Sequence, residues 1–190
     1  MSKNTIEKIK EHIVYEDPEN NPWVKLYFDT VRFPDGKEGY YNRIVENGGK
    51  SGVGILPVFN FHIGLVRQYR YPIGCEMWEI PRGFGETNNP REDAARELAE
   101  ECGFKVAPSN LLELGPVYPN SGLLASVVYL FCVKISDNEP VHKTQEKEVV
   151  EFKWFPMEEV ISLVKNGELS DSFTLSALFR AECLGILKIC

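Results

Sequence analysis

The 190-residue sequence has no dense cluster of lysine or arginine, and its formal net charge is −7. Proteins that bind nucleic acid usually carry a basic patch, so we expect no nucleic-acid partner. An acidic protein that binds an anionic small molecule needs a local positive charge, such as a metal ion or a few placed arginines. We therefore expect any such site to contain one of these.

The sequence also lacks the run of about 20 apolar residues that a membrane-spanning helix requires. Its longest apolar run, 123–133, is interrupted by Ser126 and predicts a buried strand. Residues 1–11 are charged and do not resemble a secretory signal peptide. These features predict a cytoplasmic protein that does not bind membranes.

Motifs for several kinds of chemistry are missing as well. The five cysteines are odd in number and show no C-x-x-C spacing, which argues against a disulfide framework or a structural zinc site and favours buried thiols. The sequence contains no G-x-S-x-G, H-E-x-x-H or Walker A motif, so it does not support a serine hydrolase, a zincin or a P-loop enzyme.

Regular patterns of apolar residues predict a mixture of strands and helices. Residues 23–33 and 40–46 flank a Pro-Asp-Gly turn and predict a β-hairpin. The spacing of Ile6 and Ile9 suggests a short helix before it. Further strands are expected at 52–58, 62–70, 78–80, 111–118, 124–135 and 151–155, and helices at 157–165 and 172–185. This mixture indicates a layered α/β domain.

One further helix has clear signals at both ends. Asn89 can cap it, Pro90 suits its first position, Glu92 has capping-box spacing, and Gly103 can end it.

The same helix predicts a cluster of carboxylates. At about 100° per residue, four acids share one face, and apolar residues share the opposite face; the acids are Asp93, Glu97, Glu100 and Glu101, and the apolar residues are Ala95, Leu98, Ala99 and Cys102. Hard oxygen ligands of this kind suit magnesium. The alternative is a solvated acidic face with Arg96 as its counter-charge.

The segment around this helix resembles the Nudix box, G-x5-E-x7-R-E-U-x-E-E-x-G-U, where U is a bulky apolar residue. The second half matches at every fixed position, through Arg96, Glu97, Leu98, Glu100, Glu101, Gly103 and Phe104. The first half departs from the pattern. Gly83 lies thirteen residues before Arg96 instead of fourteen, and Asn88 stands at the box glutamate position, with Glu86 the nearest acid.

The resemblance implies a fold and an assembly. We expect an α/β (α+β) protein, a Nudix-type α/β/α sandwich with a mixed sheet, preceded by an N-terminal antiparallel β extension. The expected domains are 1–47, for dimerisation and substrate binding, and 48–190, the hydrolase domain. In the ADP-ribose pyrophosphatases of this family the extension packs across a homodimer, so we expect a homodimer here.

The resemblance also implies the catalytic groups. Glu97, Glu100 and Glu101 would hold Mg²⁺, for which Mn²⁺ could substitute, and the Arg82 carbonyl is a further expected ligand. The general base would be a glutamate on a late loop, where Glu148 is the first candidate and Glu146 the second. Both could instead be ordinary surface acids.

Residues 63–72 resemble the Q-Y-R strand of ADP-ribose pyrophosphatases, which makes Arg70 a candidate phosphate or ribose contact, with a surface ion pair as its alternative. Arg67 and Glu79 are further candidates, and Trp23 or Tyr27 could stack on a purine or serve packing. The expected substrate is a nucleotide sugar, above all ADP-ribose, cleaved to AMP and ribose 5-phosphate. The alternatives are GDP-mannose or another nucleotide sugar, and a non-catalytic Nudix module that senses a nucleotide.

Overall fold

The computed structural model describes residues 5–136 and 149–189, and it divides into two compact units. Unit 1 consists of Met1–Lys50 and Tyr118–Ser126, and unit 2 of Ser51–Val117 and Val127–Cys190. The loop at 118–126 thus joins the N-terminal strands, although it follows strands of unit 2 in the sequence. Each unit is described by itself below.

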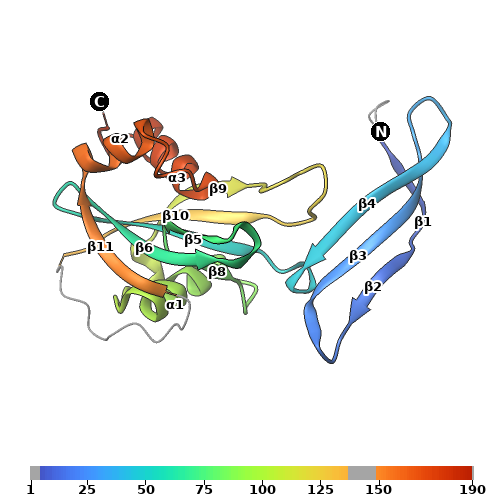
Figure 1. Cartoon of the computed structure of the whole chain (residues 1–190), viewed down its shortest axis with the longest axis horizontal. Helices are drawn as coiled ribbons and strands as arrows, with labels where there is room; N and C mark the ends of the chain where they lie inside the picture. Colours follow the sequence, from blue (N-terminus) through green and yellow to red (C-terminus); the bar gives the residue numbers. More distant parts are fainter. Residues whose placement is uncertain (1–4, 137–148, 190) are drawn as a thin grey trace. The chain divides into compact units, whose positions relative to one another are not determined.

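Unit 1 is an antiparallel sheet built around one long strand (Figure 1). β3 (Asn21–Arg32) pairs along its length with β4 (Glu38–Glu46), which confirms the predicted hairpin. On its other edge β3 pairs with β1 (Glu7–Lys10) and β2 (Ile13–Asp17). The short helix suggested by Ile6 and Ile9 is wrong, because β1 gains its backbone hydrogen bonds from β3, a partner that local spacing does not reveal.

Unit 2 contains a mixed sheet in the order β11-β6-β5-β10-β9, with β7 paired to β6 and β8 paired to β5. The pair β10–β5 is parallel and the other pairs are antiparallel. The strands are β5 (Gly52–Phe59), β6 (His62–Arg70), β7 (Cys75–Glu79), β8 (Arg82–Phe84), β9 (Leu112–Val117), β10 (Val128–Lys134) and β11 (Val149–Pro156). Gly83, the first glycine of the resemblance, therefore lies on a short strand, β8, that pairs with β5.

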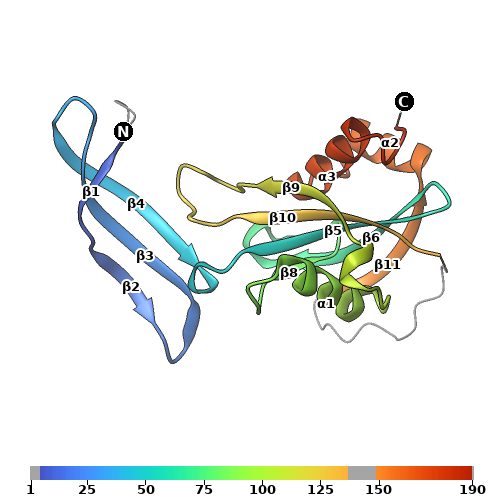
Figure 2. The same cartoon turned by 180° about the vertical axis from the view of Figure 1, so that it is seen from behind.

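Helices cover both faces of this sheet, with α1 (Pro90–Cys102) on one face and α2 (Met157–Lys165) and α3 (Ser172–Cys183) on the other (Figures 1 and 2). Alternate residues of the central strands serve the two cores. Ile55 and Phe131 pack with Leu98 of α1, while Leu56 and Leu130 belong to the cluster that contains α3. This arrangement confirms the α/β/α sandwich, and the predicted helices agree with α2 and α3.

Both ends of α1 follow the expected signals, with one difference. The Asn89 side chain accepts from the Arg91 N–H, and Gly103 ends the helix with φ +77°. Glu92 does not complete a capping box, because it accepts from the Asn89 side chain and the Asn89 N–H donates to Thr87. Within residues 5–136 and 149–189, no helix is long and apolar enough to cross a membrane. The described cysteines are free thiols; Cys102 and Cys132 are buried as expected, whereas Cys75 and Cys183 are exposed, so the expectation of buried thiols is wrong for these two.

Candidate active site

The acidic face of α1 is turned into the protein instead of toward solvent. Glu97 is 7 % exposed and Glu101 is 4 % exposed, whereas Glu100 lies further out, with a half-exposed side chain. Both buried glutamates face the short strand β8, which the sheet holds against the helix. The alternative of a fully solvated acidic face is therefore wrong for Glu97 and Glu101.

Gly83 makes this close approach possible. A β-carbon at position 83 would collide with the carboxylate of Glu97, so only glycine fits there without a shift. The backbone N–H of the preceding residue, Arg82, donates to Oε2 of Glu101 at 3.0 Å. The short strand β8 thus lies against two carboxylates from successive turns of α1.

Burial, and after it the nearby Glu97 carboxylate, raise the pKa of Glu101 to about 8, although the hydrogen bond from the Arg82 N–H acts in the opposite direction. A carboxyl in this setting holds a proton at neutral pH unless a cation joins it. The acidic residues predicted from the sequence thus lie where water is excluded, and a cation is needed to keep their negative charge there.

Arg96 supplies positive charge beside these acids. Its guanidinium donates to Glu97 at 2.7 Å, to Glu100 at 2.5 Å and to the Phe84 carbonyl at 2.9 Å. Burial alone would lower the pKa of Arg96, but the carboxylates of Glu97 and Glu100 raise it above its ordinary value. Arg96 therefore ties the helix to the end of β8.

The donors present fit a hard divalent cation. Carboxylate oxygens of this kind are the ligands that magnesium and manganese prefer. In the part of the chain that the structure describes, no three acidic, histidine or cysteine side chains are already arranged as a finished metal site. The Arg96 guanidinium donates to one carboxylate oxygen of Glu97 and to one of Glu100, so a bound cation would share these two carboxylates with Arg96.

Asp93 supports the loop before α1. Its carboxylate accepts from the Glu86 N–H at 3.0 Å, from the Thr87 N–H at 3.0 Å and from the Thr87 hydroxyl at 3.2 Å. Glu86, the acid nearest to the box glutamate position, is largely exposed and lies 3.7 Å from Arg96. The shorter contacts to the loop thus come from Asp93, which the sequence placed on the same helix face as the three candidate metal ligands.

The side chains of Arg70 and Glu79 meet across the paired strands β6 and β7, although Glu79 stands opposite Val66 in the register. Glu79 is fully buried, and both of its oxygens accept from the Arg70 guanidinium, one of them from Nε at 3.1 Å. Glu79 also accepts from Arg82 at 3.2 Å. Arg70 therefore forms an ion pair with a buried carboxylate, and not the surface ion pair that the sequence left open as an alternative. About a quarter of the Arg70 side chain remains accessible.

Arg67 belongs to a different cluster. It lies on β6 three residues from Arg70, so the two side chains leave opposite faces of the strand. Arg67 pairs with Glu76 at 3.2 Å and with Glu151 at 3.1 Å, and its guanidinium lies 5.7 Å from the Trp78 ring centroid. The structure does not bring Arg67 and Arg70 together.

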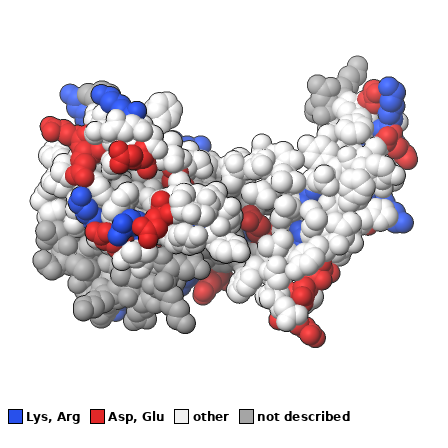
Figure 3. Space-filling view, in the orientation of Figure 1, with Lys and Arg blue, Asp and Glu red and all other residues white. Residues whose placement is uncertain are grey.

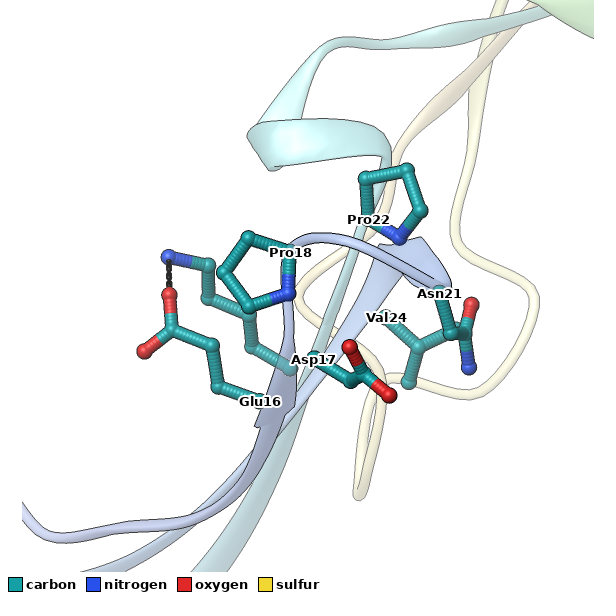
Figure 4. A pocket seen from close by; sticks show the side chains of 7 residues that line it. Glu16, Asp17, Pro18, Asn21, Pro22 and Val24 are labelled. Carbon is teal, nitrogen blue, oxygen red and sulfur yellow. Dashed lines mark ion pairs between the residues drawn. The ribbon is translucent and has the colours of Figure 1, made fainter.

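The aromatic candidates lie in unit 1. Trp23 is 58 % exposed, whereas Tyr27 is buried, with the Arg43 guanidinium 3.9 Å from its ring centroid. A hollow of about 240 Å³ opens at the turn between β2 and β3, with Pro18 and Pro22 among its lining (Figure 4). It contains none of the predicted site residues. The base candidates Glu148 and Glu146 lie outside the described residues.

Sequence reasoning missed Asp171 and Thr174 at the start of α3. Thr174 is fully buried, and its hydroxyl accepts from the Ile80 N–H at 2.9 Å. Asp171 accepts from the Thr174 N–H at 2.8 Å and from its hydroxyl at 2.7 Å. The sequence does signal the cap, because Asp is a common helix N-cap residue that accepts from the N–H three residues later. The contact between Thr174 and Ile80 is a tertiary one and has no such signal.

The chain is similar to known proteins over most of its length. The NUDIX domain family model matches residues 49–176. An ADP-sugar pyrophosphatase of Mus musculus is 32% identical over 171 residues, covering 82% of this chain and 73% of that protein. An ADP-ribose pyrophosphatase of Mycobacterium tuberculosis is 29% identical over 159 residues, covering 82% of this chain and 75% of that protein.

Two further similarities extend over nearly all or all of the chain. A GDP-mannose pyrophosphatase of Yersinia enterocolitica is 24% identical over 198 residues, covering 96% of this chain and 98% of that protein. A solved structure described as an ADP compounds hydrolase shares the fold, with a TM-score of 0.80 and 21% identity, and the match covers 100% of this chain and 98% of that one. Together with the acidic helix packed on a glycine-containing strand, these matches show that the chain belongs to the NUDIX family and is a Nudix hydrolase.

Proposed function

We propose that the chain hydrolyses the pyrophosphate bond of a nucleoside diphosphate sugar, with ADP-ribose giving AMP and ribose 5-phosphate. The observation that carries the proposal is the pair Glu97 and Glu101, buried side by side on α1 against Gly83 and Arg82. Such a pair is unfavourable alone and becomes favourable with a divalent cation. The names of the mouse and mycobacterial relatives support an ADP-linked substrate.

Glu97, Glu100 and Glu101 would hold Mg²⁺, with Mn²⁺ as a substitute, and the Arg82 carbonyl is a further proposed ligand. Bound there, divalent ions would neutralise charge that develops on the diphosphate and orient the attacking water. The water oxygen forms a bond to one phosphorus while the bridging P–O bond breaks. Glu148 or Glu146 would take the proton of the water.

Arg70 is the proposed contact to the phosphates or the ribose. Glu79 holds its guanidinium from the buried side, which leaves its accessible part for an anion. Arg67 and Trp23 are proposed as weaker contributors to binding. Tyr27 is less suited to stack on a base, because its side chain is buried under Arg43.

A homodimer formed through unit 1 is part of the proposal. The face of unit 1 in Figure 3 is largely free of charged side chains, which gather toward its ends. Many large apolar side chains of its strands are exposed, among them Ile13, Val14, Tyr15, Trp23 and Tyr40. Apolar patches of this kind mark interaction surfaces. Light scattering coupled to size-exclusion chromatography should give twice the 21.6 kDa mass of one chain. We further propose that the protein is cytoplasmic and binds neither nucleic acid nor membranes.

Product analysis of ADP-ribose with Mg²⁺ tests the function. We expect AMP release by the wild-type protein and a loss of at least ~100-fold in Glu101→Gln, as expected when a metal-based catalyst loses a ligand. Glu92→Gln is the matched control, since Glu92 lies in the first turn of the same helix and its side chain accepts a hydrogen bond from the Asn89 side chain. Equal rates in wild type and Glu101→Gln would refute the metal assignment.

GDP-mannose is the second candidate substrate, because the Yersinia pyrophosphatase that carries this name matches almost the whole chain, including unit 1. A panel of ADP-ribose, GDP-mannose and other nucleotide sugars at equal concentration separates the two. A ratio of kcat/KM that favours GDP-mannose would replace ADP-ribose in the proposal and leave the site unchanged.

A further inference from the structure

The first turn of α3 fastens the backbone segment that leads to Gly83. The buried hydroxyl of Thr174 accepts from the Ile80 N–H at 2.9 Å, across 94 residues of sequence. The same hydroxyl donates to Asp171 at 2.7 Å, so its orientation is set by the helix cap. Thr174 therefore presents a fixed lone pair to the end of β7.

Three consecutive residues are held at three different places. Ile80 donates to Thr174 on α3, the Pro81 carbonyl accepts from the Ile55 N–H of β5 at 2.9 Å, and the Arg82 N–H donates to Glu101 of α1 at 3.0 Å. The segment 80–82 thus connects the helix layer on one face of the sheet to the helix layer on the other. A shift at Ile80 moves the Arg82 N–H, because only two peptide units separate them.

The side chain of Arg82 also contacts the start of α3. Its Nη2 lies 3.2 Å from Glu79 and 3.8 Å from Asp171, and its guanidinium lies 4.8 Å from the Phe173 ring centroid. The first turn of α3 therefore holds both the backbone before Arg82 and the side chain of Arg82. Two independent contacts to one helix turn restrict the segment more than either would alone.

We propose that Thr174 is a positioning residue for the metal-binding carboxylates: through Ile80 and Arg82, its hydroxyl sets the N–H that orients Glu101. Thr174 itself lies in the layer of α3 and is not a metal ligand. The inference rests on the proposed function, since the role of Glu101 as a ligand is part of that proposal.

Removal of the Thr174 hydroxyl should displace the backbone of segment 80–82. In Thr174→Val the side chain keeps a similar shape, but the Ile80 N–H loses its acceptor in a buried position. A buried donor without a partner is costly, so the backbone is expected to shift toward another acceptor or water. The Arg82 N–H then leaves its position against Glu101.

The test measures Mn²⁺ binding by electron paramagnetic resonance in the full-length protein, with no substrate present. We expect the dissociation constant to rise about tenfold in Thr174→Val, the low end for loss of a group that supports a ligand. Thr174→Ser retains the hydroxyl and should restore binding. Leu178→Ala is the control, because it loosens the same helix from the core that Leu178 and Ile80 share, without removing a hydrogen bond to segment 80–82.

A second readout needs no metal. The amide resonance of Arg82 should show the downfield proton shift of a hydrogen bond to a carboxyl in wild type and Thr174→Ser, and lose it in Thr174→Val. If Thr174→Val does not fold, Asp171→Asn carries the test, since it weakens the acceptor that orients the hydroxyl and should weaken Mn²⁺ binding in the same direction.

Three outcomes would overturn the inference: unchanged Mn²⁺ affinity in the folded variant, an unchanged Arg82 resonance, or equal weakening by Leu178→Ala. Failure of the proposed function would look different. In that case the wild-type protein itself would bind no Mn²⁺, and Glu101→Gln would behave like wild type.

Discussion

Gly83 lies so close to the Glu97 carboxylate that no β-carbon fits between them. This contact joins the strand before the loop, β8, to the helix after it, and it brings the backbone of β8 within reach of a carboxylate pair. The close approach, more than the acids alone, distinguishes this site from an ordinary acidic helix face.

Substitution of this glycine should damage the site. We expect Gly83→Ala to lower the free energy of unfolding by about 1–3 kcal/mol, the usual range for an overpacked contact, and to abolish most hydrolysis, because Glu97 must move. Urea denaturation and product analysis measure both effects. Gly122→Ala is the stability control, since a β-carbon there meets only Asn120 at 3.6 Å. Wild-type activity in Gly83→Ala would contradict the role of this contact.

Glu101→Gln should separate stability from activity. The amide can still accept from the Arg82 N–H, and it removes a charge that burial and Glu97 disfavour. We therefore expect the metal-free variant to be at least as stable as wild type at pH 8, although it is inactive. Thermal unfolding in a chelator tests this. A large loss of stability would mean that Glu101 is chiefly a structural partner.

The pH dependence follows from the raised pKa of Glu101. Between the ordinary value of 4.5 and about 8, the folded metal-free protein holds a proton that the unfolded chain releases. The contribution of this group to the free energy of unfolding is therefore full below about 4.5, falls as pH rises to about 8, and is constant above. Urea midpoints from pH 5 to pH 9 measure it, and Glu101→Gln should remove this component.

Metal binding should show the opposite trend. A cation needs the carboxylate form, so Mg²⁺ affinity is expected to rise with pH up to about 8, with release of a proton on binding below that value. Calorimetry in two buffers of different ionisation enthalpy measures the proton. Affinity that is flat from pH 6 to pH 9 would contradict the assignment of Glu101 as a ligand.

Substitutions of Asp93 and Glu86 should differ sharply in how far they lower the free energy of unfolding. Asp93→Ala leaves two backbone donors of the loop, the N–H groups of Glu86 and Thr87, without their acceptor, and we expect a loss of about 3 kcal/mol. Glu86→Gln weakens a long, exposed ion pair with Arg96 and should stay within about 0.5 kcal/mol of wild type. Chemical denaturation of both variants decides between them. The reverse order would show that Glu86 serves as the box glutamate.

Local signals in the sequence determined much of this protein. The caps at Asn89 and Gly103, the hairpin of unit 1 and the period of the apolar residues predict elements that the structure confirms, because caps, turns and amphipathic faces depend on neighbours in sequence. The same is true of the acidic face of α1, which follows from 3.6 residues per turn. Strand β1 shows the limit, since its spacing favoured a helix and its partner strand decided otherwise.

Only the tertiary structure decided which acids do what. Sequence placed Asp93, Glu97, Glu100 and Glu101 on one face as equals, whereas the fold assigns Asp93 to the loop, buries Glu97 and Glu101 against β8, and leaves Glu100 beside Arg96. Glu79 and Thr174 acquire their roles from partners on other strands and helices. The physical reason is that burial and hydrogen-bond partners arise from contacts between distant segments, and these set the charge and orientation of a side chain.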